Sequence, residues 1–460
     1  MGGEQRVSVG AARPFAGGLT GRAMDRRDFL RLGGLGLAGV GLLGAGACGG
    51  GGGEASGDLR WSMWSASPEE TAVWQELAKD VNEKHPDITV KLETVTFEDY
   101  WNKLSTQLAS ENEADIVAMQ SLRMPGFAAR GALQPLQPFI DEDPAVNVDD
   151  FFEPIRQGLS VGEEIYAFGY DIGPILLYYN KNLFDKGGIP TPPPDEPISW
   201  EEFRQNATEL TNAGAREYGY VMQPVFDFTV PWLWSGGGDY MNAAETQCTL
   251  DTPESIEAIE FVVSMFTKDK IAAPITDLAN PNIGVETFYS GKVGMHIDGP
   301  WQFINIGENS NFEWGIAPMP AGPVGSVTWA AGSGFGISNT TGSPDAAWEA
   351  LKVITSTESL KKTAKAGRGY PARKSAVPAF EDPDAPPPND SIVQDILTNK
   401  IAEARSFKTT TTWQETSVML SRDFSPVFLG KQSVRDTIAN VKPQFDELLQ
   451  EHQEILEKQS

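Results

Sequence analysis

The sequence predicts an α/β fold, in which helices connect parallel strands. Apolar and other residues alternate over residues 59–63 and again over residues 88–92, as they do in strands. Between them, apolar residues recur every fourth position over residues 73–81, which predicts a helix with one buried face. A second helix over 100–108 and a third strand over 115–119 follow. This strand–helix–strand order requires parallel pairing through right-handed crossovers.

Two segments carry the residues that usually begin a helix. Ser67 is followed by Pro68 and then by Glu70, which is the order of a capping box. Ser199-Trp200-Glu201-Glu202-Phe203 has the same character, with Ser199 as the expected cap. We therefore predict that helices begin at Pro68 and at Trp200.

The stretch from Phe288 to Trp301 combines a short apolar strand with a carboxylate and an indole. Gly291 suits the left-handed turn that ends a helix, and residues 293–297 are too short an apolar run for another helix. Asp298 and Trp301 then fall on one tight loop. A carboxylate accepts hydrogen bonds from hydroxyl groups and an indole offers a flat apolar face, so this loop suits a sugar ring. A core tryptophan and a helix-capping aspartate are the alternative interpretation.

The amino-acid composition argues against several kinds of binding partner. The 460 residues carry a net charge of -27, which repels phosphate backbones and anionic lipid and argues against nucleic-acid binding. The three histidines and two cysteines are widely scattered, and no His-Glu-x-x-His motif occurs, so we expect neither a metal site nor a cofactor.

The N-terminal region has the features of an export signal. Residues 24–48 contain the pair Arg26-Arg27, then a run of leucine, glycine and alanine, and end at Cys48. The arginine pair is similar to a twin-arginine signal, and Ala45-Gly46-Ala47-Cys48 is similar to a lipobox, which implies acylation of Cys48. Met24 is an alternative start. We expect a signal over 1–47 and a glycine-rich tether over 48–57, and acylated Cys48 would leave Cys248 as a buried thiol.

Several motifs resemble the family 1 extracellular solute-binding proteins, the sugar-binding partners of ABC importers. The loop stretch is similar to the family's Gly-x-x-Ala-Met-x-x-x-Gly-x-Trp signature, with Gly294 in place of alanine. Further similar segments are distributed over nearly the whole chain after the signal; they are Gly131–Leu136, Tyr166–Lys181, Ser199–Phe203, Trp329–Ser338, Ala346–Ile354 and Gly367–Arg373.

The resemblance implies a two-lobed, periplasmic-binding-protein-like type II fold with interleaved chain crossings and a hinge. The expected N-lobe comprises residues 58–171 and 332–375, and the expected C-lobe residues 172–331 and 376–460. Gly173-Pro174, between two apolar runs, is the candidate hinge, because a few residues must absorb the change in backbone angles on closure.

The resemblance also implies a ligand site between the lobes. The expected ligand-binding residues are Trp64, Gln120, Arg123 and Arg368 from one side, Trp232, Trp234, Asp298, Trp301 and Trp413 from the other, and Asp171 at the base. For Trp64, Trp232, Trp234 and Trp301 a place in the core is the alternative, and for Arg123 and Arg368 a solvated surface charge.

The function implied is that of a receptor without catalytic residues. We expect an extracytoplasmic, lipid-anchored, monomeric substrate-binding protein that takes a neutral mono- or oligosaccharide to the permease of an ABC importer. The alternative is a secreted glycosidase, which needs only two carboxylates about 5 to 10 Å apart. Ser359-Leu360-Lys361-Lys362 matches the Ser-x-x-Lys motif of penicillin-recognising enzymes, but its companion motifs are missing from the sequence.

Overall fold

A computed structural model describes residues 57–65, 68–278, 280, 282–380, 397, 399–401 and 403–459. The predicted signal with Arg26-Arg27, the predicted lipidation site Cys48 and the proline-rich segment 383–388 lie outside the described residues. Gly57, the last residue of the expected tether, is the first residue of strand β1.

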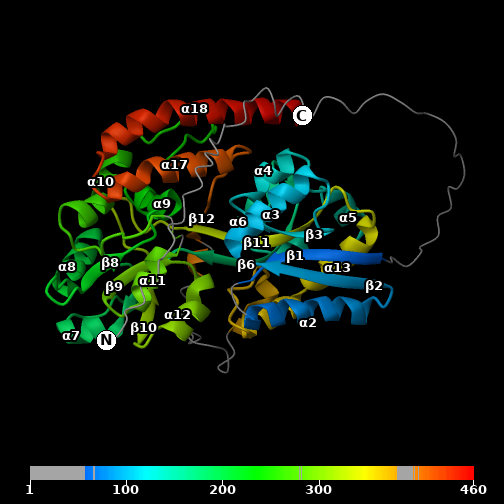
Figure 1. The fold of residues 1–460 in the computed structure, drawn as a ribbon, viewed down its shortest axis with the longest axis horizontal. Helices are drawn as coiled ribbons and strands as arrows, with labels where there is room; N and C mark the ends of the chain where they lie inside the picture. The colour runs from blue at the N-terminus through cyan, green and yellow to red at the C-terminus, as the bar shows by residue number, and fades with distance from the viewer. Residues whose placement is uncertain are drawn as a thin grey trace, which may run out of the picture. The chain divides into compact units, whose positions relative to one another are not determined.

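The first sheet has six strands, in the order β12-β11-β3-β1-β2 with β6 paired to β11 (Figure 1). Its strands are β1 (Gly57–Trp64), β2 (Ile88–Val95), β3 (Ile116–Gln120), β6 (Phe168–Pro174), β11 (Trp329–Ile337) and β12 (Arg405–Ser406). β1 runs parallel to both β2 and β3, which confirms the predicted strand–helix–strand units. β11 runs antiparallel to β3 and β6.

Short helices and one hairpin surround the first sheet. They are α2 (Pro68–Lys84), α3 (Phe97–Ala109), α4 (Met124–Ala129), α5 (Gln137–Glu142), η1 (Val148–Asp150), α6 (Glu153–Gly158), β4 (Ser160–Val161), β5 (Glu164–Ile165), α13 (Pro344–Ile354), α14 (Thr357–Lys365), η3 (Lys374–Ala376) and α15 (Val377–Phe380). We call these elements and the first sheet the N-lobe.

The second sheet has four strands, in the order β10-β7-β9-β8. They are β7 (Leu176–Asn180), β8 (Tyr218–Val221), β9 (Val293–Asp298) and β10 (Trp314–Ala317). The accompanying helices are α7 (Lys181–Gly187), α8 (Trp200–Leu210), α9 (Phe226–Ser235), α10 (Pro253–Thr267), α11 (Ile283–Tyr289), η2 (Pro300–Gln302), α12 (Phe303–Asn309), α17 (Trp413–Phe428) and α18 (Val434–Gln459). We call this group the C-lobe; α18 packs along α17, as Figure 1 shows.

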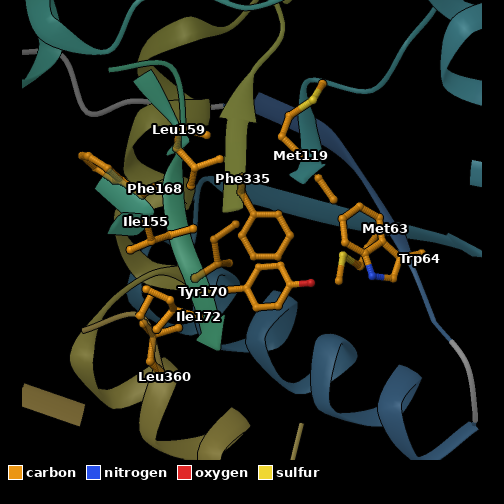
Figure 2. Packing of buried hydrophobic residues seen from close by; sticks show 14 of the residues in the cluster. Met63, Trp64, Met119, Ile155, Leu159, Phe168, Tyr170, Ile172, Phe335 and Leu360 are labelled. Atoms are coloured by element: carbon orange, nitrogen blue, oxygen red, sulfur yellow. The ribbon is translucent and has the colours of Figure 1, made fainter. Parts of the chain in front are cut away.

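Aromatic rings fill the centre of the N-lobe. Tyr170 of β6 stacks on Phe335 of β11, with ring centroids 4.9 Å apart and planes at 25° (Figure 2). Trp61 of β1 meets Phe335 edge-on at 5.0 Å. Aromatic pairs in these geometries add about 0.5–1.5 kcal/mol each to the stability gained by burial. The rings therefore fix β1, β6 and β11 relative to one another.

The chain passes between the two sheets more than once. β6 of the first sheet continues through Ile175 into β7 of the second, and β10 of the second leads back to β11 of the first. After β12, the chain enters α17 of the C-lobe. The predicted interleaved, two-lobed α/β fold is therefore confirmed.

Candidate functional site

The loop after β9 has the local structure that the sequence predicts. α11 ends at Tyr289, Gly291 has a φ of 69°, and β9 runs from Val293 to Asp298. A 3-10 turn then carries Trp301. The indole of Trp301 is partly exposed and stacks on Trp329 of β11, with ring centroids 6.2 Å apart and planes at 19°. The loop therefore joins an indole of the C-lobe to one at the start of a strand of the N-lobe sheet.

Asp298 is buried beneath this loop. Its Oδ1 accepts a hydrogen bond from the backbone N–H of Gly299 at 2.8 Å, and its Oδ2 lies 3.3 Å from Nε2 of His296. Only 3% of Asp298 is exposed. Its hydrogen bonds therefore lie within β9 and the following loop, and they fix the backbone of the loop that carries Trp301.

A residue that the sequence interpretation missed, Asp227, lies beside Trp329. The ring N–H of Trp329 donates a hydrogen bond to the backbone carbonyl of Asp227 at 3.0 Å. The Oδ1 atom of Asp227 is buried and has no hydrogen-bond partner among the residues that the structure describes. Burial raises the pKa of this carboxyl to about 6, against the opposing effect of the Arg123 charge. Asp227 is therefore an acceptor with capacity for another donor.

Gln120 and Arg123 approach the same region from the N-lobe. Nε of Arg123 donates a hydrogen bond to Oε1 of Gln120 at 3.3 Å. The guanidinium lies over the ring of Trp101, 4.6 Å from its centroid, where a cation is favoured by the π system. Its charge acts on Asp227. Gln120, Arg123 and Trp301 are thus linked through Asp227 and Trp329.

Arg368 and Asp171 belong to an internal ion cluster. Arg368 donates to a carboxylate oxygen of Glu70 and to the hydroxyl of Tyr170, the latter at 3.1 Å. Its Nη1 lies 3.5 Å from Oδ2 of Asp171, whose Oδ1 accepts from the backbone N–H of Ser333 at 2.7 Å. Both side chains are about nine-tenths buried. Arg368 is therefore committed to protein carboxylates.

The remaining expected site residues are tryptophans with little or no exposed surface. Trp64 is enclosed by three aromatic rings of α3, those of Phe97, Tyr100 and Trp101. Trp413 contacts Phe407 and other rings, and 2% of it is exposed. The position of Trp64 matches the core alternative that the sequence left open, and Trp413 is buried as well, which the sequence interpretation did not consider.

Trp232 and Trp234 lie on a helix, α9, that the sequence interpretation did not predict. Trp232 is fully buried and packs against Trp200, Phe203, Tyr220 and Phe261. Trp234 donates its ring N–H to Oδ1 of Asp239 at 2.9 Å. The glycines that follow begin only at Gly236, after the helix ends. We do not include these two indoles in the site.

Several contacts join the N-lobe to the C-lobe near Arg123 and Trp301. Arg130, just after α4, forms an ion pair of 2.6 Å with Glu415 of α17. Leu122 packs in an apolar cluster composed mainly of C-lobe residues. Gly173 of β6 also lies close to Pro300. The N-lobe segment that carries Arg123 is thus held against the C-lobe at several points.

Three further features are the possible metal ligands, the hydropathy of the helices and the thiol of Cys248. Among the residues that the structure describes, no group of three or more histidine, cysteine, aspartate or glutamate side chains could hold a metal ion. Within the same ranges, no helix combines the length and hydropathy needed to span a membrane. Cys248 is a free, buried thiol, as expected, and burial raises its pKa to about 12.

Comparison with known proteins identifies a protein family whose model matches most of this chain. A model described as bacterial extracellular solute-binding protein matches residues 65–361. A binding protein of Brucella abortus is 28% identical over 280 residues, 59% of this chain and 65% of its own length. An uncharacterized lipoprotein of Streptomyces antibioticus is 25% identical, over 58% of this chain and 60% of its own. The mannitol-binding protein of Pseudomonas aeruginosa is 27% identical, over 49% and 51%. The chain thus spans about half to two thirds of these relatives.

Solved structures share the fold over most of the chain. The ABC substrate-binding protein Lmo0181 of Listeria monocytogenes, in complex with cycloalternan, superimposes with a TM-score of 0.77 at 21% identity, covering 85% of this chain and 98% of that one. UgpB of Mycobacterium tuberculosis, in complex with glycerophosphocholine, gives a TM-score of 0.74 at 20% identity, covering 86% and 99%. At such identities, the likeness establishes the two-lobed architecture.

Proposed function

Because this chain belongs to the bacterial extracellular solute-binding proteins, we propose that it is the extracytoplasmic substrate-binding protein of an ABC importer. Its ligand is a neutral mono- or oligosaccharide, which it binds between the lobes and delivers to the membrane permease. In this proposal Cys48 carries a lipid that anchors the protein, and residues 1–47 form a twin-arginine signal. The similarity to a Streptomyces lipoprotein supports the anchor.

One observation supports the ligand class above all others: a partly exposed indole, Trp301, is linked through Trp329 to Asp227, whose Oδ1 has no hydrogen-bond partner within the described part of the chain. Trp301 stacks on Trp329, and Trp329 is hydrogen-bonded to the backbone of Asp227. The buried Oδ1 of Asp227 can accept from a hydroxyl group, and the indole can cover a C–H face of a sugar ring. Gln120 and Arg123 add amide and guanidinium groups from the opposite lobe.

The charge balance favours a neutral ligand over a phosphorylated one. Arg368, the second cation expected at the site, is paired with Glu70 and Asp171. The charge of Arg123 is opposed by that of Asp227. A dianionic phosphate would therefore meet one guanidinium together with a carboxylate, which disfavours its transfer from water.

The proposal is tested by titrating the purified protein with a panel that includes mannitol, arabino-oligosaccharides, maltose and, as an anionic comparison, glycerol 3-phosphate. We expect saturable heat and tryptophan fluorescence changes with at least one neutral compound. W301A should weaken that binding by about 1–3 kcal/mol, roughly tenfold or more. Trp200, which is also partly exposed but stacks on Phe261, provides the matched control W200A, whose affinity should be unchanged.

The outcomes separate the candidate functions. Release of reducing sugar from a glycan without any binding plateau would establish the glycosidase alternative. Tighter binding of glycerol 3-phosphate than of every neutral compound would overturn the ligand class. Equal affinities of W301A and the wild-type protein would remove Trp301 from the site.

A further inference from the structure

His296 lies in the middle of β9, and none of its surface is exposed. The ring of Phe288, from α11, stacks on it at a centroid distance of 5.6 Å and an angle of 26°. Its Nδ1 atom lies 3.1 Å from the backbone carbonyl oxygen of Val221 in β8. Its Nε2 atom lies 3.3 Å from Oδ2 of Asp298. Both ring nitrogens therefore face oxygen atoms that act as acceptors.

This geometry requires one proton on Nδ1 and a second proton between Nε2 and Oδ2 of Asp298. A neutral imidazole has one N–H, and its other nitrogen can only accept. The carbonyl of Val221 cannot donate, so Nδ1 must carry a proton. The second oxygen of Asp298 accepts a hydrogen bond from Gly299 at 2.8 Å, which favours the ionised carboxylate. Nε2 then also carries a proton, and the buried imidazolium and carboxylate neutralise one another.

The ion pair connects directly to the loop that carries Trp301. The N–H of Gly299 is held by Asp298, and the carbonyl of Gly299 accepts from the hydroxyl of Tyr178 at 2.5 Å. A Cβ atom on Gly299 would lie 2.2 Å from the indole of Trp301, so this ring lies against the bare backbone of Gly299. Fixing Gly299 therefore fixes the position of the indole.

The other titratable groups around the pair come from β7 and α11. Burial raises the pKa of Tyr178 well above its ordinary value, so its hydroxyl stays protonated and continues to donate to Gly299. Tyr289 of α11, whose pKa burial also raises, donates to Gln302 at 3.4 Å. Glu286 of α11 accepts from Asn280. The hydrogen bonds described for these three groups go to Gly299, Gln302 and Asn280, and not to His296.

We propose that His296 is a doubly protonated imidazolium whose hydrogen bonds to Val221 and Asp298 position Trp301 in the ligand site. The protonation state rests on these hydrogen bonds together with the N–H of Gly299, which favours an ionised Asp298 over a protonated one. The consequence for ligand binding rests on the proposed function. His296 is thus a positioning residue that acts through Asp298 and Gly299, without touching the ligand.

The protonation state can be measured without any ligand, by nuclear magnetic resonance on the full chain labelled with ¹⁵N-histidine. The chain has three histidines, and the variants H85Q and H452Q assign the remaining signal to His296. We expect both ring nitrogens of His296 to show protonated shifts at pH 7. A neutral tautomer of His296 at pH 7 would overturn the proposal.

The variant D298N provides a matched test that preserves the hydrogen bonds. An asparagine oxygen can accept from Gly299 while its amide donates to Nε2, so His296 should become neutral with its proton on Nδ1. The expected result is the loss of the imidazolium signature with an unchanged unfolding midpoint. Retention of the imidazolium in D298N would show that Asp298 does not hold the second proton.

The position of the indole is followed by ¹⁹F resonance of the chain labelled with 5-fluorotryptophan, with W301F to assign the signal. H296N cannot reach both Val221 and Asp298, so the Trp301 signal should shift and broaden in this variant but remain near its wild-type position in D298N. An unchanged Trp301 signal in folded H296N would overturn the positioning role. If all resonance results agree and no saccharide binds, only the proposed function fails.

Discussion

Gly173 and Pro300 approach so closely that a Cβ atom on Gly173 would lie 2.2 Å from Cγ of the proline. Gly173 lies in β6 of the N-lobe, and Pro300 opens the turn after β9 of the C-lobe. The chain passes from the first sheet to the second two residues later. The predicted hinge is therefore also a packing contact, in which a glycine admits the loop that carries Trp301.

Replacement of Gly173 by alanine should destabilise the protein. The added methyl group must displace Pro300 or β6, and overpacking of this kind costs about 1–3 kcal/mol. The free energy of unfolding, measured in urea, should fall by that amount. G307A is the matched control, because a Cβ atom at Gly307 of α12 would meet nothing within 4 Å. It should be neutral or slightly stabilising. Equal stabilities of G173A and G307A would refute the packing argument.

The N-cap of α8 provides a second stability prediction. The hydroxyl oxygen of Ser199 accepts a hydrogen bond from the backbone N–H of Glu202 at 3.1 Å, as the capping sequence predicted. S199A should lower the free energy of unfolding by about 1 kcal/mol, and S199N should retain most of it because the amide oxygen can also accept. If S199A is as stable as the wild-type protein, the cap does not contribute, and if S199N is as unstable as S199A, the loss does not come from the missing acceptor.

Features set by neighbouring residues could be predicted from the sequence. The Ser199 cap, the turn at Gly291 and the strand that follows it depend on a few adjacent residues, and all three are present. The parallel order of the first strands also follows from the alternation of helical and strand periods. Local signals therefore give the elements and the fold class.

The composition of the site depends on contacts between residues far apart in the chain. Nothing in the sequence around Trp232 indicates that Trp200, Phe203, Tyr220 and Phe261 enclose it, because these residues come from three other elements, α8, β8 and α10. Asp227 could have been suspected from its place just beyond the carboxyl end of β8, where ligands gather in such sheets. Its pairing with Trp329 joins positions 102 residues apart.

The buried carboxyl of Asp171 predicts a dependence of stability on pH. Burial raises its pKa from 3.8 to about 6, and this effect outweighs the favourable charge of Arg368 and the N–H of Ser333. Between these two values the folded protein holds a proton that the unfolded chain has lost. The contribution of Asp171 to stability therefore falls as pH rises from about 4 to 6 and is constant above that, a change of about 3 kcal/mol.

D171N should remove this dependence. As the pH is raised from 4 to 7, the free energy of unfolding of the variant should increase relative to that of the wild-type protein. Asparagine carries no proton to lose, so the variant avoids the cost of ionising a buried carboxyl. Urea denaturation across this range measures the difference. S199A removes no ionisable group, so its curve should run parallel to that of the wild-type protein. If the curves of D171N and the wild-type protein are also parallel, burial does not raise the pKa of Asp171.

The ion pair between Arg130 and Glu415 should influence ligand affinity rather than stability. It joins the end of α4 to α17 with a distance of 2.6 Å, and both side chains are about half exposed. If the ligand is bound between the lobes, a contact made only when they meet favours the bound state. An exposed pair contributes up to about 1 kcal/mol, so E415K should weaken binding of the saccharide identified in the panel by at most about fivefold. The loss should shrink as salt is raised, because screening weakens exposed charges.

The exchange R130E/E415R should restore affinity, whereas D423N, which breaks a pair within α17 itself, should not alter it. Calorimetric titrations at low and high salt measure these differences, and a loss in E415K that is independent of salt and persists in the exchange variant would exclude an electrostatic contact between the lobes.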